Sequence, residues 1–132
     1  MLLYYIKHYP FSITIIFIVC YLSFFHPPSL EVPEFPGMDK VAHFCMYAGL
    51  SGMLWVEFFF NHKKKALDIR YAITGAVICP ILFGAAIEFL QEYTTNYRQG
   101  DIIDFIANTS GVIISSAICW YVIRPLIIKK QS

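Results

Sequence analysis

Charged residues are scarce in this sequence, and their scarcity limits the classes of protein to which it can belong. Of the 132 residues, 14% are charged and 58% are hydrophobic, and the mean hydropathy is +0.58. A soluble domain carries roughly 25% charged residues, so this chain has too few to cover a globular surface. The composition excludes an ordinary soluble enzyme and favours a small bundle of membrane helices, each about 20 mainly apolar residues long.

The sequence also lacks a strong positive charge and any closely paired cysteines. Its net charge is +1, so no basic surface indicates a nucleic-acid partner. Its four cysteines all lie within apolar runs and form no CxxC pair. This pattern is typical of inert buried thiols and not of a disulfide framework or a thiolate metal site.

Four apolar segments, separated by polar or proline-rich connections, make up most of the chain. We expect a single all-α integral membrane domain over residues 1–132, a four-transmembrane-helix bundle with helices at approximately 10–26, 40–60, 70–93 and 101–124. The first segment is short enough for a signal peptide, but no small-residue cleavage site follows it, so we interpret it as an uncleaved helix. Pro80 predicts a kink in the third helix, where a neighbouring group meets the freed carbonyl.

The distribution of lysine and arginine predicts the orientation in the membrane. Eight basic residues fall on one side of the expected bundle, and only Lys40 and Arg98 fall on the other. By the positive-inside rule, we expect both termini to be cytoplasmic in a multi-pass membrane protein. We expect Glu57, near the cytoplasmic end of the second helix, to snorkel to the surface or to pair with the Lys63–Lys65 triplet.

Polar side chains form stripes on three of the expected helices, all near the outer face. Ionisable residues within membrane helices usually face the bundle interior and mark function. Residues three or four positions apart share one helix face, so each stripe is continuous. The stripes consist of Asp39, His43 and Tyr47 in the second helix, Glu88 and Gln91 in the third, and Asp101, Asp104 and Asn108 in the fourth, preceded by Arg98 in the loop. Their convergence predicts an outward-facing polar cleft.

Each of these residues also has a structural interpretation. Asp39 and Asp101 are suited to capping helix N-termini, and Asn108 is suited to hydrogen bonding between helices. Arg98 is suited to an exposed ion pair of little energetic value. Gly111 is best explained as a position of close helix packing. Packing alone does not require histidine, arginine and several carboxylates in one place, so we favour a binding or catalytic site.

The same residues carry a resemblance to a known family. The chain resembles the VanZ-like membrane proteins, named for a protein associated with teicoplanin resistance, from about residue 38 to 116. Three motifs carry the resemblance: Asp39-Lys40-x-x-His43-Phe44, Glu88-x-x-Gln91, and Arg98-x-x-Asp101-x-x-Asp104-x-x-x-Asn108-x-x-Gly111. The resemblance implies a small integral membrane protein linked to glycopeptide susceptibility and the cell envelope. It implies no particular reaction.

Two mechanisms fit the polar residues best. In the first, the protein is an enzyme acting on a lipid-linked or cell-wall precursor, with His43, Glu88 and Asp104 as the candidate catalytic acids and bases. In the second, the protein binds a lipid head group or peptide terminus without chemistry. In either case the candidate substrate-binding residues are Asp39, Lys40, Gln91, Arg98, Asp101 and Asn108, among which the cations would hold a phosphate or carboxylate.

A metal site and a transport pathway are further alternatives. His43, Glu88, Asp101 and Asp104 offer one nitrogen and several oxygens, which suits magnesium, manganese or zinc. No HExxH motif or cysteine pair supports such a site, so we predict no bound metal and assign no cofactor. Four spans enclose little space for a transport pathway within one chain. The partner that the sequence predicts with least ambiguity is the lipid bilayer.

Overall fold

The computed structural model describes residues 1–24, 37–62, 68–94 and 102–129, and all of their regular secondary structure is helical, as predicted. The α-helices are α1 (Leu2–His8), α2 (Pro10–Phe24), α3 (Met38–Asn61), α4 (Ile69–Ile73), α5 (Cys79–Thr94), α6 (Ile102–Ile118) and α7 (Arg124–Lys129). Two π-helical segments, η1 (Thr74–Ile78) and η2 (Cys119–Ile123), join α4 to α5 and α6 to α7 without a break. The four expected helices begin close to the predicted boundaries, but α1 was not expected, and the fourth helix continues through Pro125 to Lys129 and does not end at residue 124. Residues 25, 26 and 101 of the expected helices lie outside the described residues.

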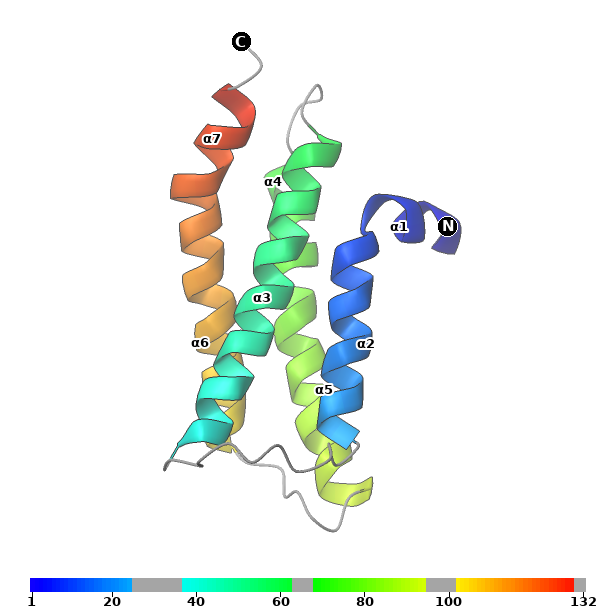
Figure 1. The fold of residues 1–132 in the computed structure, drawn as a ribbon, viewed down its shortest axis with the longest axis vertical. Helices are drawn as coiled ribbons and strands as arrows, with labels where there is room; N and C mark the ends of the chain where they lie inside the picture. Colours follow the sequence, from blue (N-terminus) through cyan, green and yellow to red (C-terminus); the bar gives the residue numbers. More distant parts are fainter. Residues whose placement is uncertain (25–36, 63–67, 95–101, 130–132) are drawn as a thin grey trace.

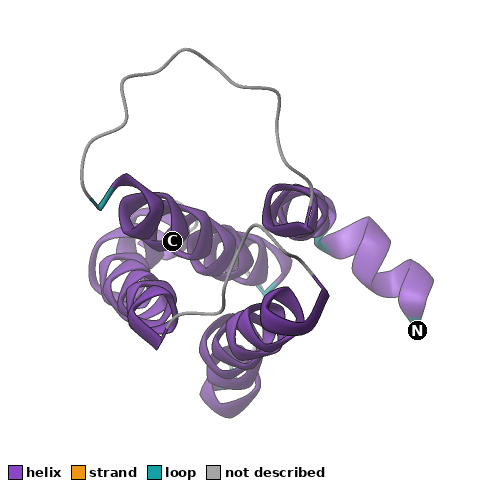
Figure 2. Cartoon of the chain, turned by 90° about the horizontal axis from the view of Figure 1, so that it is seen from below, coloured by secondary structure: helices purple, strands orange, loops and turns teal. Residues whose placement is uncertain are grey.

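The long helices run side by side in an antiparallel bundle (Figure 1). Both termini lie at the end where α3 finishes and α4 starts. The opposite end brings together the start of α3, the start of α6 and the end of α5. Figure 2, a view along the bundle, shows the N-terminal helix lying away from the packed helices. The most extensive packing joins α3 to α6.

Two of the continuous helices are long and apolar enough to cross a membrane, Ile69–Tyr93 and Ile102–Ile128. A third span exists if α1 and α2 are counted together, although their axes are bent by 100°. The described residues therefore contain two, or up to three, spans by length and composition, and not clearly the four expected. The reason is that α2 has only 15 residues, whereas α3 has 24 but includes His43 and Glu57 within its length.

The outward-facing side chains fit a lipid environment. Large apolar residues on the bundle surface include Leu82, Phe89, Ile113 and Tyr121, each more than half exposed. A soluble protein rarely exposes so much contiguous apolar surface. The structure and the composition thus agree on a membrane protein.

Pro80 shapes the third long helix in the way its sequence position predicts. Proline has no N–H, so it cannot bond to the carbonyl four residues earlier, which here belongs to Ala76. The Ser51 hydroxyl of α3 donates to that Ala76 oxygen at 2.6 Å. The π-helical turn η1 ends two residues before Pro80, and η2 likewise ends two residues before Pro125. A neighbouring helix therefore meets the carbonyl that Pro80 frees, as expected for a membrane helix.

Gly111 allows α6 to approach α3 closely. A methyl group at this position would overlap the carbonyl oxygen of Phe44 and lie 3.1 Å from the backbone nitrogen of Ala48. The Ser115 hydroxyl, one turn further along α6, donates to the Ala48 oxygen at 2.8 Å. The prediction that Gly111 is a packing position is confirmed, and this close contact sets the distance between the polar stripes of α3 and α6.

Glu57 is buried at the end of the bundle that holds the termini, with 7% of its surface exposed. Its carboxylate accepts hydrogen bonds from the backbone nitrogens of Phe11 and Ser12, at 2.9 and 3.2 Å, and from the Ser12 hydroxyl. The expectation that Glu57 snorkels to the surface is therefore wrong. Free N–H groups at the start of α2 attract a carboxylate more strongly than the distant surface does.

Candidate functional site

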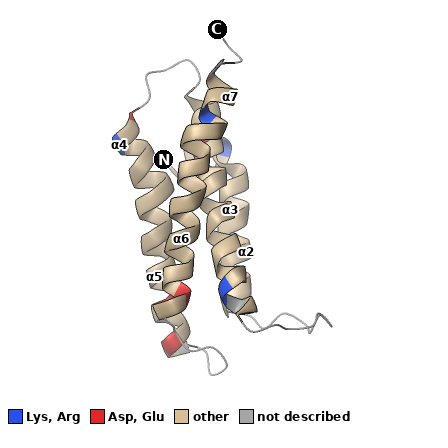
Figure 3. Cartoon of the chain, turned by 90° about the vertical axis from the view of Figure 1, so that its left-hand side faces the viewer, with Lys and Arg blue, Asp and Glu red and all other residues tan. Residues whose placement is uncertain are grey.

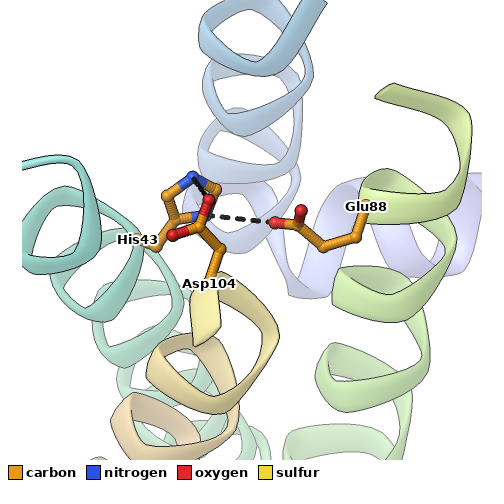
Figure 4. A group of neighbouring side chains, drawn as sticks. All are labelled: His43, Glu88 and Asp104. Carbon is orange, nitrogen blue, oxygen red and sulfur yellow. Dashed lines mark ion pairs between the residues drawn. The ribbon is translucent and has the colours of Figure 1, made fainter. Parts of the chain in front are cut away.

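Four polar side chains from three helices meet inside the bundle, at the end opposite the termini. They are His43 of α3, Glu88 of α5, and Asp104 and Asn108 of α6, and we call them the His43 cluster. His43 is 2% exposed and Asn108 is fully buried, while Glu88 and Asp104 are also buried. Figure 4 shows His43, Glu88 and Asp104 pointing toward one another from their separate helices. These four residues were all candidates from the sequence.

The imidazole ring of His43 is the centre of the cluster. Its Nδ1 atom lies 3.1 Å from Oδ1 of Asn108, within hydrogen-bond distance. The same nitrogen lies 3.5 Å from Oε1 of Glu88, and the Nε2 atom lies 3.7 Å from Oδ2 of Asp104. Oxygen atoms therefore face both ring nitrogens, and the two carboxylates approach from different helices (Figure 4).

The positions of these side chains follow from the helical repeat and from the contact between α3 and α6. Asp104 and Asn108 are four residues apart, so they lie on one face of α6. Gly111 continues that face by almost one turn, at the point of closest approach to α3. His43 immediately precedes Phe44, whose carbonyl Gly111 contacts, so the ring of His43 is held opposite Asn108.

A lysine connects the cluster to the end of the bundle. The Nζ atom of Lys40 lies 3.6 Å from Oδ1 of Asp104, and the Lys40 side chain is 41% exposed. Figure 3 shows that the described charged residues lie toward the two ends of the long helices, with none visible in the middle. The cluster thus lies next to a partly exposed cation.

Gln91 makes a different contact from the one that its sequence position suggests. Its side-chain nitrogen donates to the backbone oxygen of Ser23 in α2 at 2.9 Å, and the residue is 2% exposed. This bond joins α5 to α2 near the cluster end of the bundle. Gln91 lies one turn from Glu88, so it also helps to hold Glu88 in place. Its role in substrate binding stays a prediction.

Three further candidates are not tested by the described side chains. Arg98 and Asp101 lie outside the described residues, and the Asp39 side chain is likewise outside the description. The backbone shows that Gly37, with φ of 86°, is the N-cap residue of α3. Asp39 therefore lies in the first turn of α3 and does not occupy the N-cap position. Gly37 is the residue type that this left-handed conformation favours.

Tyr47 was on the predicted stripe of α3 but was not proposed as a site residue. It is completely buried, and its hydroxyl has no hydrogen-bond partner among the described residues. A methyl group at Gly84 would lie 3.1 Å from the Tyr47 ring and 3.3 Å from Nδ2 of Asn108, so both residues pack against the same point of α5. Its position one turn after His43 was the signal that could have identified it.

A family model matches residues 1–124, nearly the whole chain, and its description is VanZ/LLP1. The chain belongs to the VanZ/LLP1 family. This confirms the resemblance inferred from the three motifs and extends it to the first helix, which carries none of them. No curated protein and no solved structure gives a significant match. The His43 cluster of this VanZ-family protein is built from residues of all three motifs.

The geometry of the cluster supports two kinds of chemistry. An imidazole between two carboxylates can accept or donate a proton, with the carboxylates stabilising the charged ring. One nitrogen and several oxygens can also bind a cation. Both kinds of chemistry need the cluster to be reachable from the end of the bundle where Lys40 lies.

Proposed function

We propose that this VanZ-family protein is a four-span protein of a bacterial cytoplasmic membrane, with both termini in the cytoplasm. Three helices would then carry the His43 cluster in the outer half of the membrane. The asymmetry of lysine and arginine supports this orientation. The position of both termini at the end opposite the cluster is consistent with it (Figure 1).

We further propose that the His43 cluster modulates the cell envelope and lowers susceptibility to glycopeptides such as teicoplanin. The observation that carries this proposal is the burial of His43, Glu88 and Asp104 among three helices. Each ionised group inside a membrane costs about 2.5–3.5 kcal/mol on insertion scales, and such groups usually serve function. Lys40, at the outer end of the cluster, is placed to attract an anionic head group or a lipid-linked precursor.

Teicoplanin susceptibility of a sensitive host tests this proposal. Cells would express the wild type, His43→Gln, Glu88→Gln or Asp104→Asn, with equal amounts of protein in the membrane. We expect the wild type to raise the inhibitory concentration and the three variants to lose that effect. Glu57→Gln is the matched control, because it also removes a buried carboxylate, but one that lies at the opposite end of the bundle. Unchanged susceptibility with the wild type would contradict the proposal.

The second candidate function is an enzyme acting on a lipid-linked or cell-wall precursor. The close approach of both carboxylates to the His43 ring favours it, since acid–base catalysis needs such a proton relay. Purified protein would be incubated with lipid-linked precursors, and products would be followed by mass spectrometry. An enzyme should lose turnover in His43→Gln. A binding protein without chemistry should tolerate His43→Gln and lose ligand affinity in Lys40→Met.

A further inference from the structure

One hydrogen bond orients the ring of His43. A neutral imidazole carries a single N–H, and its other nitrogen presents a lone pair. The 3.1 Å contact between Nδ1 and Oδ1 of Asn108 has hydrogen-bond length, and because an amide oxygen only accepts, this bond places the proton of a neutral ring on Nδ1. The Nε2 lone pair then faces the Asp104 carboxylate, 3.7 Å away. Two electron-rich groups face each other at a distance that leaves space for a cation.

The distances in the cluster fit a metal ion. One ligand atom from each of His43, Glu88 and Asp104 lies within 4.8 Å of the other two. Bonds of about 2.0–2.2 Å to zinc place tetrahedral ligand atoms about 3.3–3.6 Å apart. The 3.7 Å from Nε2 of His43 to Oδ2 of Asp104 is close to these values. Glu88 lies 3.5 Å from Nδ1, the nitrogen that contacts Asn108, so its side chain has to rotate toward Nε2 to close the site. A divalent ion also balances the charges of the two carboxylates.

Asn108 and Tyr47 give a second, independent indication of a ligand. Asn108 is fully buried, and its Nδ2 group has no hydrogen-bond partner among the described residues, although its Oδ1 atom contacts His43. The buried Tyr47 hydroxyl also has none within that part of the chain. Buried donors without partners are rare and indicate a missing acceptor. Both residues pack against Gly84 of α5, beside the cluster.

We propose that His43, Glu88 and Asp104 bind a divalent transition-metal ion, Zn²⁺ or Mn²⁺. One imidazole with carboxylates is a donor set for these ions, whereas Ca²⁺ and Mg²⁺ prefer oxygen alone. Asn108 holds the His43 ring through Nδ1, as outer partners of ligating histidines commonly do. Three protein ligands leave a further coordination position for an oxygen atom of water or of a bound molecule. The proposal names the cofactor of the site in the proposed function and rests on that function for its biological role.

Equilibrium dialysis of the purified full chain in detergent tests the metal site. The protein would carry a tag without histidine, be stripped with a chelator, and be dialysed against Zn²⁺ or Mn²⁺ alone. We expect one ion per chain in the wild type. Glu88→Gln and Asp104→Asn should each weaken binding at least about tenfold, and Asn108→Ala should weaken it about 10–100-fold without removing a ligand. Lys40→Met removes a competing cation from Asp104, so it should bind at least as tightly as the wild type.

Two controls separate this site from adventitious binding. Glu57→Gln removes a buried carboxylate elsewhere, and His62→Gln removes a histidine at the opposite end of α3. Both should bind one ion with unchanged affinity. Co²⁺, used as a coloured probe, should give a visible ligand-field spectrum in the wild type and in His62→Gln but not in His43→Gln. Circular dichroism would confirm that each variant is helical.

The outcomes are distinct. The proposal is overturned if the wild type retains no stoichiometric ion, or if Glu88→Gln and Asp104→Asn bind as well as the wild type. The cluster would then be an ion triad around a doubly protonated His43. Metal binding by a wild type that leaves teicoplanin susceptibility unchanged would preserve the metal site and reject the proposed function. Protection against teicoplanin by a protein that binds no metal would preserve the proposed function and reject the metal site.

Discussion

Buried carboxylates lie near both ends of α3, but the partners of those carboxylates differ. At the end near the termini, Glu57 accepts hydrogen bonds of 2.9 and 3.2 Å from backbone nitrogens at the start of α2. At the other end, Glu88 and Asp104 approach the two ring nitrogens of His43 at 3.5 and 3.7 Å. The hydrogen bonds of Glu57 are short and come from backbone groups. The contacts of Glu88 and Asp104 with His43 are longer and join titratable side chains.

Under the proposed function, this difference separates a structural carboxylate, that of Glu57, from the functional carboxylates of Glu88 and Asp104. Backbone N–H groups at a helix start cannot change their protonation, and they need an acceptor wherever the helix is buried. A carboxylate there only holds α2 against α3. Side chains that can exchange protons or bind a cation, gathered from three helices, do not merely join helices. The partners of a buried acid, and not its burial alone, therefore indicate its role.

The largest effect on stability is expected for Gly111→Ala, which disturbs the packing of α6 against α3 next to the His43 cluster. The added methyl group overlaps the Phe44 carbonyl, and overpacking of this kind costs about 1–3 kcal/mol, here toward the upper limit. The midpoint of thermal unfolding in detergent should fall accordingly. Gly49→Ala on α3 is the matched control, because a methyl group there meets no atom within 4 Å. Equal stability of the two variants would show that α3 and α6 are not in close contact.

A comparable loss is expected for Glu57→Ala, at the structural end. The change leaves Phe11 N, Ser12 N and the Ser12 hydroxyl without their acceptor, and unmade buried hydrogen bonds cost about 1–3 kcal/mol. Detachment of α2 should increase the labelling of Cys20, which lies on α2 and is half-buried. The protection that each folded molecule gives against teicoplanin should not change. Loss of that protection at equal abundance would contradict the division into two ends.

The smallest effect on stability is expected for Glu88→Gln, at the functional end. The substitution keeps the shape of the side chain and removes a charge from a buried site, so the unfolding midpoint should change little or rise. Metal binding and protection against teicoplanin should nevertheless be lost. A fall in stability as large as that of Glu57→Ala would indicate that the His43 cluster serves mainly to hold the helices together.

Much of this architecture follows from local sequence patterns. Apolar runs predicted the helices, because a membrane helix satisfies its own backbone hydrogen bonds and needs only an apolar surface. The spacing of Asp104, Asn108 and Gly111 predicted one face of α6, and the antiparallel order predicted that this face meets His43. Glu88 was expected nearby for the same reason. These inferences need only helical geometry and chain direction, which a single sequence contains.

Other features could not be predicted, because they depend on which helices touch and at what height. The bond from Gln91 to Ser23 joins residues 68 apart in sequence, and that from Glu57 to Ser12 joins residues 45 apart. Neither Gln91 nor Glu57 has a sequence spacing that indicates its partner on α2. The burial of Tyr47 against Gly84 likewise depends on the approach of α5 to α3.

The amino-acid sequence by itself determined the helical class, the membrane environment, the family and the polar residues that gather at one end. It did so because hydropathy and helical periodicity are properties of neighbouring residues. Only the tertiary structure decided that His43 lies between Glu88 and Asp104 with its ring held by Asn108, and that Glu57 caps α2. Those contacts depend on sub-nanometre distances between helices, which are set by close packing at residues such as Gly111.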